Sequence, residues 1–204
     1  MTALSRLGLI ALAMTAFLGF MVIDHANARA SGTEIVLDVR GYDPRDIFLG
    51  HFSLIRTDLQ QLDASELDGD DSFERGDPIY VVLERGDDDS WAPVSLHATR
   101  PDSGVFIHGF VGSRYTIEQE WTDPETGEPL AEARRVNRIQ IHASFNIERY
   151  YASREMALDF DRRLRSFDED GNNGVRLILS LPPSGDAIIK GFEIDGVRRI
   201  DRLW

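Results

Sequence analysis

The sequence contains no cysteine, only one lysine and comparatively few positive charges. The absence of cysteine excludes disulfides, thiolate nucleophiles and Cys-ligated zinc or iron–sulfur sites, whichever compartment holds the chain. An amine that serves as a nucleophile or base must be Lys190 or the N-terminus. The 35 acids outnumber the 22 bases, which gives a formal net charge of −13. Such a surface disfavours nucleic acid and anionic lipid headgroups, so no nucleic-acid partner is expected.

The length and composition fit one globular domain. The chain has 204 residues, of which 42% are hydrophobic and 28% are charged. That is enough for one real hydrophobic core and too little for two large ones. No fixed-period repeat and no long linker divides the chain. We therefore predict a membrane anchor or signal peptide with a short linker over residues 1–30, followed by one domain over residues 31–204.

A long uncharged run lies near the N-terminus. Leu7–Ile23 has 17 residues without a charge, at the short end of the roughly 17–25 residues of a membrane-spanning helix and beyond the about 7–15 of a signal-peptide core. Arg6 precedes the run and Asp24 follows it. Because positive charge stays on the cytoplasmic side, the run predicts a single span through the lipid bilayer, with residues 31–204 exported.

A cleaved signal peptide is the competing interpretation of this segment. Ala26-Asn27-Ala28 and Ala28-Arg29-Ala30 both have the small-x-small pattern of a cleavage site. The length of the apolar run favours a retained anchor. In either case the domain is expected outside the cytoplasm.

The rest of the chain has the pattern of short strands separated by turns. Period-two alternation of apolar and polar residues is typical of half-buried strands. Asp58–Glu74 is predicted as a loop with a short helix, and Glu155–Phe167 is the one segment with helical spacing. The pattern predicts a mainly β fold, a sandwich or barrel-like domain with one short helix. The predicted strands are Thr33–Val39, His51–Arg56, Ile79–Glu84, Trp91–Thr99, Val105–Val111, Arg114–Trp121, Arg138–Tyr151, Val175–Leu181, Ala187–Ile194 and Val197–Leu203.

One acidic loop resembles a calcium-binding loop only in part. Asp168–Gly174 places oxygen ligands at the first, third and fifth positions. An EF-hand loop also needs glycine at the sixth position and a carboxylate at the twelfth, where this chain has Asn173 and Leu179. The histidines in or beside the strands show no close pair spacing either. We predict a turn here, no metal site and no cofactor.

Two polar stretches supply the candidate binding residues. In the first, Asp43-Pro44 predicts a turn in which Arg45 and Asp46 pair locally, with His51 beside them. The second, "NIERYY", contains Glu148, Arg149 and Tyr150. We expect these six residues to be mostly structural, with a binding rim as the functional alternative; no catalytic residue is predicted.

The alternation along Arg138–Tyr151 makes a sharper prediction for the second stretch. If the strand is continuous, Ile147 and Arg149 share the core face, and Glu148 lies on the wetter face. A buried Arg149 would need an acidic partner, because an unpaired buried charge is costly. Asp46 is the candidate for that partner.

Three stretches resemble the GDYXXLXY family, membrane-anchored bacterial proteins of unassigned function. These are "GTEIVLDVRGYDPRDIFLGHFSLI", "FNIERYYAS" and "SGDAIIKGFEIDGV". Their order and placement match the family over nearly the whole chain. The signature itself differs: Gly-Asp-Tyr reads Gly50-His51-Phe52, its leucine position holds Ile55, and its final tyrosine position holds Thr57.

The resemblance implies a single-pass protein of the bacterial inner membrane with a periplasmic domain. A non-enzymatic accessory that binds another membrane protein is the favoured hypothesis. An anchored hydrolase with a Ser/Lys dyad and a small-ligand-binding module are the alternatives. The sequence shows no nucleophile and base at a spacing typical of a catalytic pair, which weighs against the hydrolase. A concave pocket at Arg45, His51 and Glu148 would distinguish a ligand site from a flat partner surface.

Overall fold

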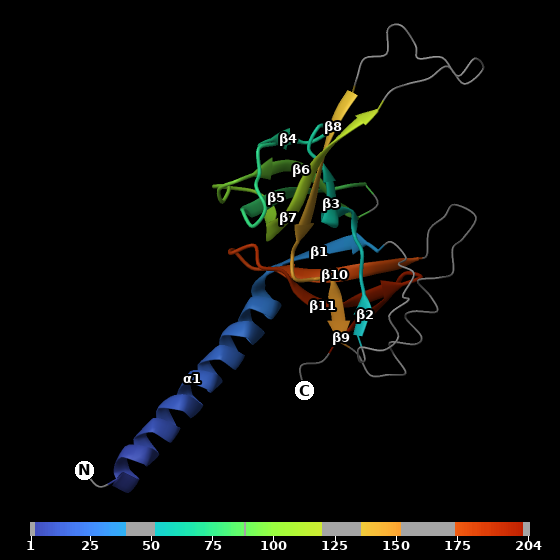
Figure 1. Cartoon of the computed structure of the whole chain (residues 1–204). Coiled ribbons are helices and arrows are strands. Elements are labelled where there is room, and N and C mark those ends of the chain that lie inside the picture. The colour runs from blue at the N-terminus through green and yellow to red at the C-terminus, as the bar shows by residue number, and fades with distance from the viewer. Residues whose placement is uncertain (1–2, 40–51, 88, 120–135, 152–173, 202–204) are drawn as a thin grey trace, which may run out of the picture.

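The computed structural model describes residues 3–39, 52–87, 89–119, 136–151 and 174–201. These residues form one long helix that leads into a β-rich body of three sheets (Figure 1). The mainly β fold expected from the sequence, with a sandwich or partly closed barrel, is confirmed. The predicted helix over Glu155–Phe167 lies outside the described residues, as do most of the acidic Asp168–Gly174 loop and all of residues 122–135.

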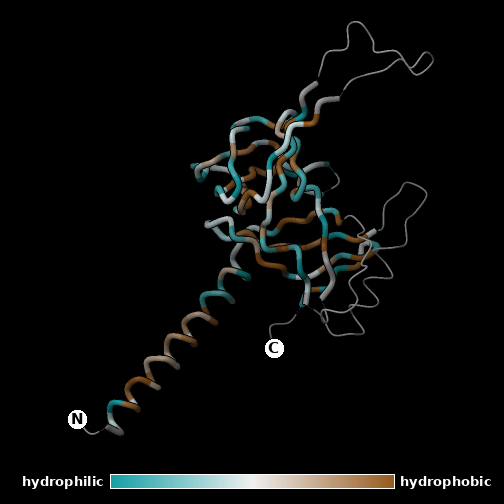
Figure 2. The backbone as a smooth tube through the Cα atoms, viewed as in Figure 1, coloured by the Kyte–Doolittle hydropathy of each residue, from teal (hydrophilic) through white to brown (hydrophobic). Residues whose placement is uncertain are grey.

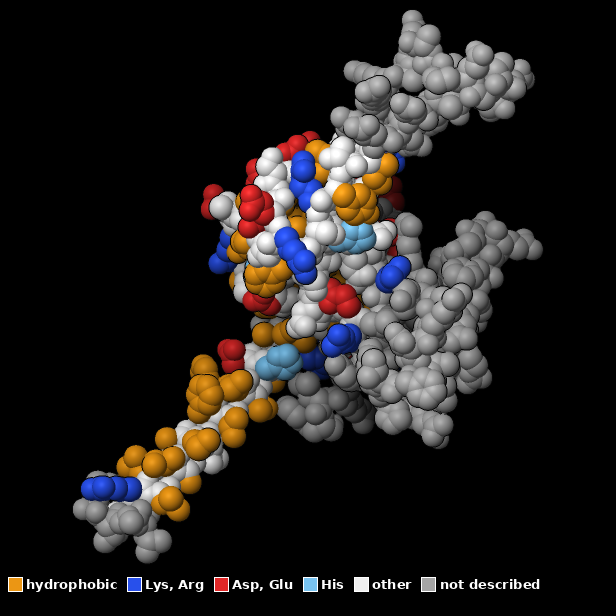
Figure 3. All heavy atoms as spheres, in the orientation of Figure 1, with side chains coloured by type: hydrophobic (Ala, Val, Ile, Leu, Met, Phe, Trp, Pro, Cys, Tyr) orange, Lys and Arg blue, Asp and Glu red, His pale blue; other side chains and the backbone are white. Residues whose placement is uncertain are grey.

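Helix α1 (Ala3–Ser31) projects away from the β-rich body (Figure 1). All of the large apolar side chains between Leu7 and Ile23 are at least 51% exposed, so no described part of the chain covers them. Figure 2 shows hydrophobic residues along much of the helix, and Figure 3 shows their side chains gathered on its surface. The helix is long and apolar enough to cross a membrane, as a signal sequence near an N-terminus also is.

A four-stranded antiparallel sheet follows the helix. Its strands lie in the order β1-β10-β11-β12, and strand β1 begins two residues after the helix ends. Their bounds are β1 (Thr33–Asp38), β10 (Val175–Leu181), β11 (Ile188–Ile194) and β12 (Val197–Ile200). Strand β10, which lies between β1 and β11, is buried at six of its seven positions, and the end of helix α1 contacts it.

The second large sheet has six strands in the order β3-β8-β7-β5-β6-β4. Its strands are β3 (Gln61–Asp63), β4 (Asp68–Gly69), β5 (Pro78–Arg85), β6 (Trp91–His97), β7 (Val105–Gln119) and β8 (Val136–Ser144). A short 3-10 helix, η1 (Asp58–Gln60), precedes β3. The segment expected to be a loop with a short helix therefore also contributes two short edge strands, β3 and β4.

One hydrophobic core joins the two large sheets. Ile35 and Leu37 of β1 belong to the same buried cluster as Val81 and Leu83 of β5 and Ile107 of β7. In β1 and β5 the core residues alternate with less buried neighbours, as expected of strands with one face in the core. For Thr33–Val39 the predicted inward face of Ile35, Leu37 and Val39 is confirmed.

Two predicted strands are in fact one. Val105–Val111 and Arg114–Trp121 were expected to be separate, but β7 runs through the first and through the described part of the second, as far as Gln119. The pairing with β8 shifts between Val111 and Ser113, so Gly112 is the extra residue of a β-bulge. The bulge exchanges the two faces of the strand and leaves the ladder otherwise continuous.

Arginine 29 fastens the end of helix α1 to the four-stranded sheet. The half-buried Arg29 donates from Nη2 to the carbonyl oxygens of Lys190 at 2.8 Å and Asp201 at 2.7 Å. On the same helix end, the carbonyl oxygen of Ala28 accepts a 3.0 Å hydrogen bond from the hydroxyl of Ser180. Gly32 then passes so close to the sheet that an added Cβ would lie 2.8 Å from the backbone carbon of Leu181. The helix and the body therefore meet at a fitted junction.

Candidate ligand-binding site

The first two stretches that suggested a family are neighbours in space. Strand β2 (Phe52–Leu54) pairs antiparallel with β9 (Arg149–Tyr151). The pairing is extended by the backbone N–H of Ile55, which donates to the carbonyl oxygen of Glu148 at 2.9 Å. The structure thus brings residues 52–57 beside residues 145–151.

The continuous strand expected over Arg138–Tyr151 is wrong. Strand β8 ends at Ser144, and β9 pairs with β2 in another sheet. Between them Asn146 adopts a φ of 60°, a left-handed conformation that asparagine tolerates better than most residues and that breaks a strand. The chain turns at this point, so alternation counted from Ile139 does not apply beyond it.

The turn also reverses the predicted exposure of Arg149. Its side chain is exposed, whereas Glu148 is half-buried. Glu148 Oε1 accepts hydrogen bonds from the backbone N–H of Phe145 at 2.6 Å and from the hydroxyl of Ser144 at 3.1 Å. The carboxylate therefore closes the β8–β9 turn. Arg45, Asp46 and His51 lie outside the described residues, so the predicted Arg149–Asp46 pair stays untested.

Tyr150 joins the small β2–β9 ribbon to the four-stranded sheet. Its ring is 6% exposed and packs edge-on against Phe192 of β11, with 4.5 Å between ring centroids. Its hydroxyl donates to Asp201 Oδ1 at 2.9 Å. Burial of the phenol, and then its hydrogen bond to the Asp201 carboxylate, raise the pKa of Tyr150. These contacts give Tyr150 a structural role.

A polar cleft of about 500 Å³ opens where β3, the end of β8 and the β8–β9 turn meet. This volume is within the roughly 300–1,000 Å³ typical of small-molecule sites. Of the predicted site residues that the structure describes, Glu148 lines it. The lining consists of Arg56, Thr57, Asp58, Gln60, Gln61, His142, Ala143, Ser144 and Glu148, and we call it the polar cleft.

Threonine 57 is the most unusual residue of the polar cleft. It is 5% exposed, and its hydroxyl has no hydrogen-bond partner in the described part of the chain. Ile55, two residues earlier, is 1% exposed, so both side chains face inward. Thr57 also borders a smaller hollow of about 90 Å³ beside Trp91. In the sequence, Thr57 stands out only as a departure from the family signature.

The other lining residues belong to one sheet edge. Gln61 of β3 pairs with His142 of β8. The ring of His142 stacks on Tyr115 of β7 at 5.4 Å between centroids, and a 2.9 Å hydrogen bond joins His142 Nε2 to the Tyr115 hydroxyl. The sequence contained no signal for this grouping, because the edge forms only when segments far apart in the chain pair.

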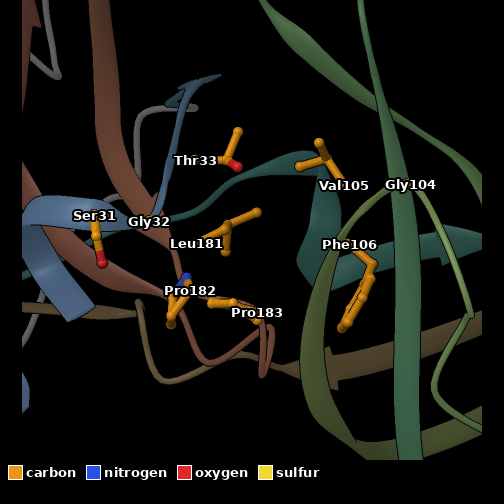
Figure 4. A pocket seen from close by; sticks show the side chains of 9 residues that line it. All are labelled: Ser31, Gly32, Thr33, Gly104, Val105, Phe106, Leu181, Pro182 and Pro183. Carbon is orange, nitrogen blue, oxygen red and sulfur yellow. The ribbon is translucent and has the colours of Figure 1, made fainter.

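A second, smaller pocket lies at the junction of helix and body. It has a volume of about 140 Å³, and Figure 4 shows the side chains of Val105, Phe106 and Leu181 around it, with Ser31 at the end of helix α1 and Thr33 at the start of β1. This is below the size range of small-molecule sites. The pocket is a packing gap where α1, β1, β7 and the β10–β11 loop converge. Within the described ranges, no group of three possible metal ligands occurs.

The described residues thus form a β-rich body that carries an apolar N-terminal helix. A polar cleft lies near the place where two of the family-like stretches meet. The family model described as GDYXXLXY protein matches residues 14–192. The chain therefore belongs to the GDYXXLXY family, as its resemblance predicted. No curated protein and no solved structure matches the chain significantly.

Proposed function

We propose that this chain is a single-pass, membrane-anchored binding module of the bacterial inner membrane, with its β-rich domain in the periplasm. In this proposal it is a non-enzymatic accessory and works beside another membrane protein. The observation that carries the proposal is the combination of an exposed apolar helix with a fitted helix–body junction. The orientation follows from Arg6 before the apolar run and Asp24 after it.

The junction favours a retained anchor over a cleaved signal peptide. Both small-x-small patterns fall inside helix α1, and cleavage after Ala30 would remove Arg29. That loss would break the hydrogen bonds to Lys190 and Asp201. This contribution to the folded body supports a retained anchor.

The contacts of Lys190 argue against the hydrolase alternative. Lys190 Nζ lies 2.6 Å from Glu34 Oε2, and Arg198 binds the other oxygen of the same carboxylate. The only lysine of the chain thus serves in a surface ion-pair network between β1, β11 and β12. A general base needs an amine that accepts a proton from a nucleophile, and an ammonium held in an ion pair does not provide one.

The polar cleft favours a binding role for the Glu148 region. Convergence of Arg45, His51 and Glu148 was the feature that would separate a ligand site from a flat partner surface, and it stays untested because Arg45 and His51 lie outside the described residues. Glu148 itself lines a concavity of about 500 Å³. The cleft therefore favours a ligand-binding module as the second candidate function. Both candidates share the anchor and the outward orientation.

Because the chain has no cysteine, single cysteines can be introduced and labelled to test the anchor and its orientation. Single cysteines at Ser5 and at Ser103 would be labelled in intact cells with a membrane-impermeant maleimide. We expect labelling at Ser103→Cys alone, and labelling of both after the membrane is opened. The Ser5→Cys chain should keep its full mass in the membrane fraction. Labelling of Ser5→Cys in intact cells, or loss of residues 1–30 from the mature chain, would contradict the proposal.

A further inference from the structure

Asp201 is the residue at which helix α1, the four-stranded sheet and the β2–β9 ribbon meet. Its carbonyl oxygen accepts a hydrogen bond from Arg29 Nη2 at 2.7 Å, and its carboxylate accepts one from the Tyr150 hydroxyl at 2.9 Å. Its backbone N–H donates to the carbonyl oxygen of Lys190 at 2.8 Å, and the same oxygen accepts from Arg29. One residue therefore contacts both the end of the helix and the ribbon.

The β2–β9 ribbon positions part of the polar-cleft lining. Glu148 comes directly before β9, and residues 56–58 follow β2 after Ile55. The hydrogen bond from the Ile55 N–H to the Glu148 carbonyl joins these two segments. Gln61 and His142, by contrast, belong to β3 and β8 of the six-stranded sheet. The shape of the cleft therefore depends on how the ribbon lies relative to that sheet.

Tyr150 ties the ribbon to the four-stranded sheet. Its ring is buried and packs edge-on against Phe192 of β11, and its hydroxyl bonds to Asp201, which follows β12. A buried hydroxyl that loses its acceptor is costly, because it gives up hydration without compensation. A displacement of Asp201 therefore draws Tyr150, and with it the ribbon, in the same direction.

We propose that Asp201 is a conformational link between the membrane helix and the polar cleft. When the end of helix α1 undocks, Asp201 shifts, and the ribbon shifts Glu148 and residues 56–58 with it. A membrane partner that tilts or rotates α1 then changes the cleft. Because coupling between two sites is reciprocal, a molecule in the cleft also changes the docking of the helix. This inference rests on the proposed function as an anchored accessory and states how its binding region is regulated.

Hydrogen exchange of the full chain in lipid nanodiscs tests the link from the helix side. The readout is the exchange of the Ile55 and Phe145 amides, which we call the cleft amides. Both donate to Glu148, the first to its carbonyl oxygen at 2.9 Å and the second to its carboxylate at 2.6 Å. In Arg29→Ala the cleft amides should exchange about two- to thirtyfold faster, the range expected of coupling between packed sites.

The same measurement tests the link from the ribbon side. Tyr150→Phe keeps the ring and removes the hydrogen bond to Asp201, so residues 24–33 at the helix end should exchange faster than in the wild type. Tyr115→Phe is the matched control, because it removes a hydroxyl that bonds to His142 instead. In this control, residues 24–33 should exchange at the wild-type rate. Retained protection in β5 and β7 shows that each variant folds.

Asp201→Ala separates coupling from two independent effects. It keeps the backbone carbonyl that Arg29 binds and removes the carboxylate that Tyr150 binds. In this background, Arg29→Ala should still accelerate exchange over residues 24–33 but should have no further effect on the cleft amides.

Three results would overturn the inference. These are wild-type exchange of the cleft amides in Arg29→Ala, wild-type exchange of residues 24–33 in Tyr150→Phe, and equal acceleration of the cleft amides by Arg29→Ala with and without the Asp201 carboxylate. None of them bears on the anchor, since the labelling of Ser5→Cys and Ser103→Cys tests the anchor and its orientation independently.

Discussion

Replacement of Arg29 by alanine should loosen the junction between helix α1 and the four-stranded sheet. The guanidinium makes two short hydrogen bonds, at 2.8 Å to the Lys190 carbonyl and at 2.7 Å to the Asp201 carbonyl. A third contact, to the Ile189 carbonyl, is at the 3.5 Å limit and adds little. Alanine removes all three donors, and the carbonyl oxygens must then bond to water.

The expected loss follows from the two short bonds. Hydrogen bonds to charged groups contribute about 1.5–3 kcal/mol each. Arg29 is only half-buried, so the lower end applies, and two bonds give about 3 kcal/mol. Since about 1.4 kcal/mol is a factor of ten, undocking of the helix end should become roughly a hundredfold more favourable.

Hydrogen exchange of the junction measures this opening. The amides of residues 24–33 should exchange faster in Arg29→Ala, including the N–H of Gly32, which donates to the Ala28 carbonyl at 3.2 Å. Amides of β5 and β7 in the six-stranded sheet should keep their protection. The matched control is Arg75→Ala, since Arg75 is exposed and has no described partner.

The reasoning would be refuted by unchanged exchange over residues 24–33 in Arg29→Ala. Equal acceleration in Arg75→Ala would also refute it, because the effect would then not depend on the junction. Arg29→Lys provides an intermediate test. An ammonium keeps the charge but lacks the planar fork that reaches two carbonyls at once, so the exchange rate should lie between those of wild type and Arg29→Ala.

Three further predictions concern ionisable groups. The hydrogen bond from Lys190, followed by that from Arg198, lowers the pKa of Glu34 from its ordinary 4.5 against the opposing effect of burial. The stabilisation by the Glu34 carboxylate is therefore present above pH 4.5 and lost as the pH falls through the lower folded value. The difference in melting temperature between wild type and Glu34→Gln, worth under about 1 kcal/mol for a group this exposed, should disappear in acid; a constant difference would contradict this. In alkaline titration followed by phenolate absorbance, Tyr150 should ionise last, and Tyr150→Phe should remove that late step and cost about 1 kcal/mol in urea melts; a late step that persists would assign it to another tyrosine. Calcium should not raise the melting temperature, because the Asp168–Gly174 loop lacks the terminal carboxylate; a calcium-dependent rise lost in Asp170→Ala would show a site there.

The alternation of apolar residues predicted most strands but could not locate every turn. Thr33–Val39 and Ile79–Glu84 are strands because their inward residues enter one core. Phe145 and Ile147 also alternate and are both buried, yet a left-handed Asn146 lies between them. Every second side chain thus stayed buried beyond the point where strand β8 ends. For this reason the predicted faces of Glu148 and Arg149 were wrong.

The candidate site was predicted only at Glu148. Its other walls come from η1, β3 and the end of β8, which are brought together by pairing between distant segments. Thr57 and Gln61 have no short-range pattern that marks them as cleft residues. A single sequence does not indicate which polar side chains will line the same cleft. The site could therefore be located only from the fold.

The fitted end of helix α1 determines how the body can move. A domain on a flexible linker samples a large volume above its membrane. Here the residues from Asp24 to Ser31 continue the helix, which at about 1.5 Å per residue places the first strand roughly 12 Å beyond the apolar run. With α1 in the bilayer, rotation about the helix axis is the main freedom that remains. The polar cleft then follows a circle at a nearly constant height, and any ligand or partner must be met within that thin layer.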